Sequence, residues 1–322
     1  MMSSNSSFKS DLSSLQATPS SAVIIIPGFL TEPITRKLFS DELGQDRAAG
    51  KEAREGSSGL PLEALDAFDP TKALDARAWQ QELERVVDTE RHELSCFHWA
   101  SESLVGLFAS CAELLYRERG SLSLRALGVG HKLAQKLQRT WREATLSADA
   151  AGAALYERVR AQAERSPDQA IYIIGHSLGA RIALRFAELL SAQPLQAPVY
   201  ISAWAPAIDQ EELNWDAISR LPQAPELFHS PHDLVLKYLY KLGKVSLTGI
   251  QALDIAALTL AMAQKNSAVG LNGAGSTYPQ ELQISLEDTA IGHLTYLSEM
   301  PTLFERSTML QALEAPKALP SL

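Results

Sequence analysis

The chain has 322 residues, a mass of 35.1 kDa, 46% hydrophobic residues and a formal net charge of −9. Such a chain can bury a large core, and its length suits either two domains or one large α/β domain. The acidic balance argues against a nucleic-acid partner, because such proteins need basic side chains to neutralise phosphates. Two cysteines, Cys96 and Cys111, are too few for a disulfide framework or a four-ligand zinc site, so we expect free thiols and a cytoplasmic location.

The chain begins with a segment that we expect to be disordered. Residues 1–21 contain nine serines and no apolar signal segment. The β-branched run at 22–26 then predicts a buried strand that ends at a Pro-Gly pair. A helix is expected at 32–43, a mobile loop rich in Gly, Ser and charge at 44–61, and an amphipathic helix at 75–91.

The rest of the chain alternates between strand and helix patterns. A second strand is expected at 94–99, and residues 101–165 predict an insert of two or three helices without any strand. A third strand at 171–174 leads directly into a helix at 178–190. Three further strands are expected, at 198–204, 227–229 and 282–286. This alternation predicts about six mostly parallel strands with helices on both faces of the sheet.

Residues 171–181, IYIIGHSLGAR, form the most informative segment of the sequence. Gly175, Ser177 and Gly179 give the pattern G-x-S-x-G between an apolar strand and a helix. This context predicts a nucleophile elbow, a sharp turn that lifts the serine hydroxyl above the sheet. The glycines leave room for a strained backbone, and the helix N-terminus favours developing negative charge. The alternative is that Ser177 only caps a helix in another doubly wound protein.

A serine hydroxyl is a weak nucleophile at neutral pH, so it needs a base, and the base needs an orienting acid. In folds with this elbow, the order along the chain is serine, acid, histidine. Three of the seven histidines precede the elbow, and His176 lies inside it, where its ring cannot easily turn back onto the serine. His293, in a loop after the last predicted strand, is therefore the best candidate base. His232 is the alternative.

Asp233 is the best candidate for the orienting acid. It follows the strand predicted at 227–229, where a loop carboxylate can reach an imidazole. Asp209 competes with it, because it follows the preceding strand in the same way. Either carboxylate would fix the tautomer of the histidine and stabilise the imidazolium.

An oxyanion hole for this site should consist of two backbone N–H groups. One is that of Leu178, the residue directly after the serine. The second should come from the loop after the first strand. We choose Phe29 there, because Pro27 has no N–H and Gly28 gives the turn its freedom. We expect neither a metal nor an organic cofactor.

Several blocks of the chain together resemble the α/β-hydrolase superfamily, and most closely the transmembrane and coiled-coil domain-containing hydrolases. The blocks are VIIIPGFL at 23–30, HWASESL at 98–104, GHSLGAR at 175–181, SPHDLVL at 230–236 and GHLTY at 292–296. The resemblance spans roughly residues 22–300 with gaps. It implies an α/β-hydrolase fold and an esterase- or lipase-like serine hydrolase, and it strengthens Asp233 and His293 as acid and base.

We expect a single α/β-hydrolase domain over 22–316, in which 101–165 is the helical insert and 242–275 a candidate lid. Within that lid, the apolar stretch 245–263 contains one charged residue, Asp254, which would cost about 3 kcal/mol at the centre of a bilayer. We therefore expect no integral membrane span. Three lysines that precede the stretch suggest a possible peripheral contact with an anionic membrane: Lys237, Lys241 and Lys244.

The function predicted from these features is hydrolysis of a carboxylic ester, of a lipid or another apolar acyl compound, through an acyl-enzyme on Ser177. Two alternatives use the same three residues: an acyltransferase and a thioesterase. A third alternative is a catalytically inactive hydrolase-fold protein that acts as an interaction module. A small-molecule or lipid ester is thus the expected partner.

Overall fold

The computed structural model describes residues 21–28, 76–99, 131–245, 263 and 267–314. Its centre is a six-stranded sheet in which every neighbouring pair is parallel and the order is β2-β1-β3-β4-β5-β6. The strands are β1 (Ser21–Ile26), β2 (His92–Cys96), β3 (Ala170–His176), β4 (Val199–Trp204), β5 (Glu226–His229) and β6 (Gln283–Ser285). The expected α/β class with six strands is confirmed, and the sheet is parallel throughout.

The central strands are apolar on both faces because helices cover both faces. All six residues of β1 are buried, and so are six of the seven residues of β3. The two edge strands, β2 and β6, are only partly buried. This contrast explains why the central strands read as continuous apolar runs, whereas the edge strands carry polar residues.

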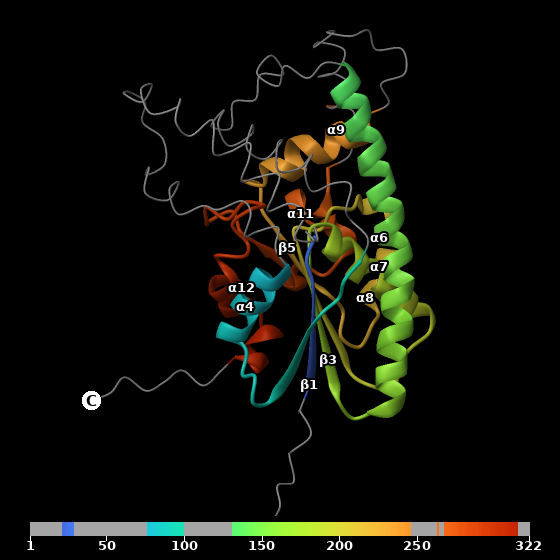
Figure 1. Ribbon diagram of the computed structural model, residues 1–322, viewed down its shortest axis with the longest axis vertical. Helices are drawn as coiled ribbons and strands as arrows, with labels where there is room; N and C mark the ends of the chain where they lie inside the picture. The colour runs from blue at the N-terminus through green and yellow to red at the C-terminus, as the bar shows by residue number, and fades with distance from the viewer. Residues whose placement is uncertain (1–20, 29–75, 100–130, 246–262, 264–266, 315–322) are drawn as a thin grey trace, which may run out of the picture.

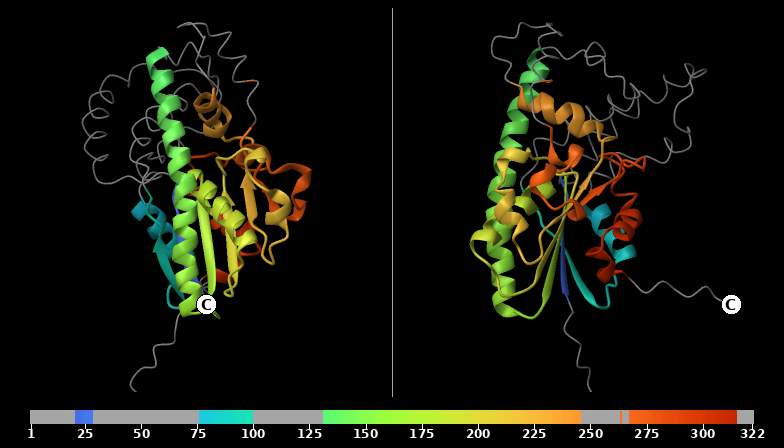
Figure 2. Two further views of the ribbon diagram at one scale, coloured as in Figure 1. Left: turned by 90° about the vertical axis from the view of Figure 1, so that its right-hand side faces the viewer. Right: turned by 180° about the vertical axis from the view of Figure 1, so that it is seen from behind.

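Two helical layers enclose the sheet (Figures 1 and 2). One layer contains α6 (His131–Arg165), α7 (Leu178–Ala192) and α8 (Trp215–Ser219); the other contains α4 (Ala76–Val86) and α12 (Met300–Arg306). Two short helices, α9 (Lys241–Lys244) and α11 (Val269–Asn272), lie near the carboxyl ends of the strands (Figure 1). The remaining turns are 3-10 helices at Gln210–Glu212, Gly275–Thr277, Gln280–Leu282 and Leu310–Leu313, and a π-helix at Val235–Tyr240.

The part of the insert that the structure describes, 131–165, is one continuous helix of 35 residues, which agrees with a helical insert without strands. One helical prediction needs correction. The helix expected at 75–91 ends at Val86, because Val87 forms an isolated β-bridge with Glu314 and a turn follows. Other predictions lie outside the described residues: the disordered segment up to residue 20, the helix at 32–43, the loop at 44–61, the insert up to residue 130 and most of the candidate lid, 246–262.

The strand order creates a topological switch point between β1 and β3. From β1 the chain moves outward to β2, and it then returns to the other side of β1 to begin β3. Adjacent connections that leave in opposite directions open a crevice at the carboxyl ends of these two strands. In open parallel sheets this crevice is where ligands bind. Gly28 follows β1 and Ser177 follows β3, so both residues lie at this crevice.

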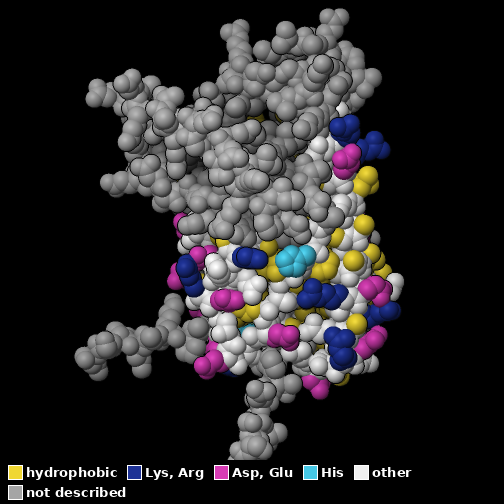
Figure 3. Space-filling model, in the orientation of Figure 1, with side chains coloured by type: hydrophobic (Ala, Val, Ile, Leu, Met, Phe, Trp, Pro, Cys, Tyr) yellow, Lys and Arg dark blue, Asp and Glu magenta, His cyan; other side chains and the backbone are white. Residues whose placement is uncertain are grey.

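Side chains of both charges are mixed over the surface that Figure 3 shows. Lys and Arg alternate there with Asp and Glu, and the described residues on this face form no continuous basic stripe. Nucleic-acid-binding surfaces generally concentrate basic residues in one patch. The described residues on this face therefore form no basic patch of the kind that binds nucleic acids.

Candidate active site

Ser177 occupies a tight turn between β3 and α7. Its φ of 57° and ψ of −118° form a backbone conformation that residues with a Cβ rarely adopt. Two contacts with the end of β4 hold the turn: the Ser177 N–H donates to the Trp204 carbonyl at 2.8 Å, and the Ala207 N–H donates to the Ser177 carbonyl at 3.2 Å. The strain is thus imposed by the neighbouring strand, and it fixes the direction of the serine side chain.

The glycines of the turn lie where no side chain fits. A Cβ at Gly179 would be 1.9 Å from the Ile26 carbonyl oxygen, and one at Gly175 would be 2.5 Å from the Gly179 oxygen. A Cβ at Gly28 would be 2.6 Å from the Cβ of Ser177. The end of β1 and the first turn of α7 therefore pack backbone to backbone beside the serine.

Ser177, His293 and Asp233 form a hydrogen-bonded chain although they come from three separate segments. His293 Nε2 lies 2.8 Å from Ser177 Oγ, and His293 Nδ1 lies 2.7 Å from Asp233 Oδ2. The relative exposures of the three residues are only 1%, 3% and 0%, respectively. In this arrangement the imidazole can accept the serine proton while the carboxylate holds the ring in the required tautomer.

Backbone and side-chain contacts hold the acid and histidine loops in place. Asp233 Oδ1 accepts the N–H of Leu236 at 2.8 Å, which leaves Oδ2 for His293. Ser230, which is fully buried, donates its hydroxyl to the Ile291 carbonyl at 2.6 Å. This bond links the loop that carries Asp233 to the loop that carries His293. The π-helix that follows Asp233 is a rare element that is frequent at functional sites.

One of the two predicted oxyanion donors belongs to the described residues. Leu178 is the first residue of α7, and the first turn of that helix contains no acidic side chain. Its N–H therefore belongs to the positive end of the helix, which favours a developing oxyanion. Phe29 lies outside the described residues. The loop that leads to it is held by Trp99, whose indole N–H donates to the Pro27 carbonyl at 3.1 Å.

The two alternative site residues lie elsewhere. His232 places its Nε2 3.1 Å from the Glu287 carbonyl oxygen rather than at Ser177. Asp209 accepts a hydrogen bond from the Tyr240 hydroxyl at 2.7 Å and forms an ion pair with Lys244. The structure therefore brings His293 and Asp233 to the serine, and it places neither His232 nor Asp209 there.

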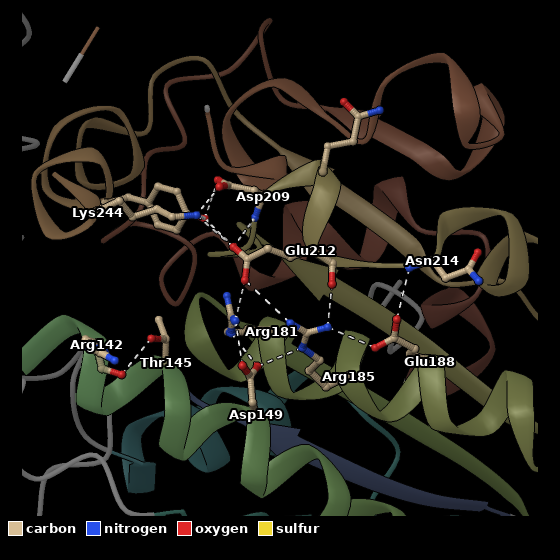
Figure 4. Close-up of polar contacts among 12 residues, drawn as sticks. Arg142, Thr145, Asp149, Arg181, Arg185, Glu188, Asp209, Glu212, Asn214 and Lys244 are labelled. Carbon is tan, nitrogen blue, oxygen red and sulfur yellow. Dashed lines mark hydrogen bonds and ion pairs between the residues drawn. The ribbon is translucent and has the colours of Figure 1, made fainter. Parts of the chain in front are cut away.

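Asp209 belongs to a cluster of ion pairs that joins α7, the helix after Ser177, to α6, α9 and the segment after β4 (Figure 4). Arg181, whose side chain is 5% exposed, donates twice to Asp149 of α6, at 2.7 and 2.9 Å, and once to Glu212 at 2.6 Å. Lys244 of α9 lies 3.0 Å from the same Glu212. Lys244, one of the three lysines of the expected membrane contact, thus forms ion pairs with Asp209 and Glu212.

The pKa values in the cluster follow from these contacts. Burial alone would raise the pKa of Glu212, but Arg181 and then Lys244 outweigh it and lower that pKa from 4.5 to about 2. Burial likewise opposes the lowering of the Asp149 pKa, which Arg181 and Arg185 bring below its usual value. Both carboxylates are therefore held in the charged form.

Sequence reasoning missed several residues of the site. Trp99 and Ser230 lie in blocks that the resemblance marked, but nothing in their spacing predicts a hydrogen bond to Pro27 or Ile291. Arg181 follows Ser177 by one helical turn, a position that could have drawn attention to it. The position of His176 next to Ser177 does not predict that its ring lies against His293, with the centroids 4.8 Å apart.

The described residues contain neither a metal cluster nor a membrane-spanning helix. No group of three or more His, Cys, Asp or Glu side chains there is arranged to hold a metal ion. None of the described helices combines the length and apolar character needed to cross a membrane. Comparison of the chain with models of protein families, with curated proteins and with solved structures finds no match.

Proposed function

We propose that this protein is a serine hydrolase of the α/β-hydrolase type, with Ser177 as nucleophile, His293 as general base and Asp233 as its orienting acid. One observation carries the proposal: the unbroken chain of hydrogen bonds from Ser177 Oγ through both ring nitrogens of His293 to Asp233. The strained turn at Ser177 and its position at the switch point of the sheet support it further.

In the first half of the proposed reaction, Ser177 attacks the carbonyl carbon of an ester. His293 Nε2 takes the hydroxyl proton while Oγ forms the new C–O bond and the carbonyl electrons move to oxygen. The tetrahedral intermediate then expels the alcohol as its C–O bond breaks. The imidazolium returns the proton to that leaving oxygen, which leaves an acyl group on Ser177.

In the second half, water replaces the alcohol. His293 removes a proton from water, and the hydroxide oxygen bonds to the acyl carbon. Collapse of this second intermediate breaks the bond to Oγ, and the proton on His293 returns to Ser177. Asp233 stays ionised throughout and stabilises the positive charge that His293 carries in both intermediates.

The negative oxygen of each intermediate needs hydrogen-bond donors. The N–H of Leu178 is our proposed first donor, and that of Phe29 remains our proposed second donor. Mutational loss of one such donor typically reduces kcat by about 100- to 1,000-fold. Trp99 supports this part of the site, because its bond to the Pro27 carbonyl fixes the end of β1 next to Ser177.

The proposed substrate is a carboxylic ester with an apolar acyl group, a lipid ester included. This choice rests on the resemblance of the sequence to esterase- and lipase-like hydrolases. An acyltransferase or a thioesterase would form the same acyl-enzyme and would differ in the acceptor or in the leaving group. Product analysis with added alcohols and with thioesters separates these reactions.

Activity-based labelling tests the proposal directly. A fluorophosphonate probe should modify wild-type protein at one site, and peptide mapping should assign that site to Ser177. The Ser177→Ala variant should take no label. The Ser191→Ala variant is a matched control, because it removes a hydroxyl from the same helix and should label like wild type.

A series of nitrophenyl esters from acetyl to palmitoyl then identifies the preferred acyl length. Hydrolysis that depends on Ser177 and His293 supports the proposal. Wild-type protein that neither takes the probe nor cleaves any ester in the series would refute it, and would favour the interaction module instead.

A further inference from the structure

His176 precedes the proposed nucleophile and is buried in a box of aromatic rings. Its ring is stacked on Trp79 of α4, with the centroids 4.9 Å apart and the planes 28° apart. On another side it lies against His293, 4.8 Å between centroids, and against Tyr296 at 5.2 Å. The residue is only 5% exposed. The proposed base is thus in contact with a second, inaccessible histidine ring.

This second histidine stays uncharged. Burial, reinforced by the nearby His293, holds the pKa of His176 well below its usual 6.5, although a backbone hydrogen bond with His293 acts in the opposite direction. Its Nε2 has no hydrogen-bond partner among the described residues. The ring of His176 therefore lies against His293 in its neutral form.

We propose that His176 is a positioning residue, whose neutral ring holds His293 in line with Ser177. This inference rests on the proposed function, because it concerns the proposed base. His293 is anchored at Nδ1 by Asp233, but one hydrogen bond leaves the ring free to rotate about that contact. The His176 ring, tilted at 48° to that of His293, restricts the rotation, so that Nε2 stays 2.8 Å from Ser177 Oγ.

The contact also suits the charged state of the base. When His293 becomes an imidazolium during the reaction, a neutral aromatic ring beside it is compatible with the charge, whereas a second imidazolium would repel it. His176 and Tyr296 are both buried beside His293. His176 thus contributes through the orientation of His293 and not through any contact with substrate.

Two substitutions separate ring contact from other roles. His176→Phe keeps an aromatic ring of similar size, and His176→Ala removes it. Tyr172→Ala is the matched control, because it removes a stacked ring from the amino-terminal part of the same strand, where Tyr172 lies against Tyr200 at 4.7 Å. The readouts are the rate of fluorophosphonate labelling, kcat and KM on the best ester, and the low-field NMR signal of the His293 Nδ1 proton, assigned with His293→Ala.

His176→Ala should slow labelling and lower kcat by about 10- to 100-fold with little change in KM, because a small misalignment of reacting groups greatly reduces the reaction rate. It should also weaken the low-field signal. The labelling rate and kcat of His176→Phe should stay within about threefold of wild type, because this variant keeps an aromatic ring in contact with His293. Tyr172→Ala should resemble wild type in all three readouts.

Wild-type rates in His176→Ala would overturn the positioning role, and so would equal losses in the Ala and Phe variants. Failure of the proposed function is recognised separately. If wild-type protein takes no probe, the NMR signal still reports the geometry of His293. Its loss in His176→Ala alone would support positioning, and its persistence in that variant would overturn it.

Discussion

Ser177 is a non-glycine residue at a positive φ of 57°, and backbone hydrogen bonds with Trp204 and Ala207 keep it there. Such conformations cost about 1–3 kcal/mol for a residue with a Cβ and persist where function requires them. The residue that acts as the proposed nucleophile, Ser177, therefore also lowers the stability of the folded protein.

Replacing Ser177 by glycine should release this strain. We expect Ser177→Gly to be more stable than Ser177→Ala by about 1 kcal/mol, because glycine adopts positive φ without steric cost, although it is also more flexible in the unfolded chain. Both variants lose the nucleophile, so activity does not confound the comparison. Urea denaturation of the two proteins measures the difference, and a less stable glycine variant would show that the turn is not strained.

Ser230 links the two loops that carry Asp233 and His293. Ser230→Ala should lower the free energy of unfolding by about 1–3 kcal/mol, because the buried Ile291 carbonyl loses its partner. It should also lower kcat more than it changes KM. The control is Ser298→Ala, which removes an exposed hydroxyl that donates to the Thr295 carbonyl. Equal effects of the two substitutions on stability and kcat would contradict the linking role.

At the scale of elements, the ion cluster around Arg181 clamps α7 between α6, the segment after β4 and α9. Arg181 contacts both Asp149 and Oε2 of Glu212, and Lys244 contacts Oε1 of Glu212 (Figure 4). Helix α7 is therefore held at its first turn by ion pairs, in addition to its apolar packing on β3 and β4.

Removal of Arg181 should be far more costly than removal of a surface arginine. Arg181→Met should destabilise the protein by about 3 kcal/mol, because two partly buried carboxylates lose their main cation. The control is Arg220→Met, which breaks an exposed pair with Asp216 and should cost at most about 0.5 kcal/mol. Chemical denaturation measures both. Restoration of stability by adding Glu212→Gln to Arg181→Met would identify the uncompensated charge as the cause.

At the scale of the whole molecule, two groups should make the fold sensitive to acid. His176 has a folded-state pKa below its usual 6.5, and Glu212 has one of about 2, below its usual 4.5. For both groups the unfolded chain binds protons more readily than the folded protein does. Their stabilising effect is therefore present above the unfolded pKa and is lost as pH falls below it.

Stability should accordingly decline in two ranges as pH falls. The decline that begins below pH 6.5 depends on His176 and should be smaller in His176→Phe. The decline between pH 4.5 and about 2 depends on Glu212 and should be smaller in Glu212→Gln. Free energies of unfolding measured by urea across this pH range test both. Unchanged pH dependence in a variant would contradict the assignment to that group.

The sequence by itself determined the features that depend on local pattern. Apolar runs placed five of the six strands to within two residues at either end, whereas β2 ends three residues before its predicted end. The spacing of Gly175, Ser177 and Gly179 located the turn that the structure contains. These features could be predicted because strand periodicity and turn chemistry act over a few neighbouring residues. The early end of α4 could not, because Val87 pairs there with Glu314, a residue far along the chain.

The tertiary structure alone decided which distant residues meet. Asp209 and Asp233 both follow a strand, so their sequence contexts are equivalent, yet Lys244 and Tyr240 engage the first and His293 lies against the second. The partners of His176 and Arg181 come from segments that no periodicity connects. Strand order and loop direction set these contacts, because they bring residues about 60–120 positions apart to one edge of the sheet.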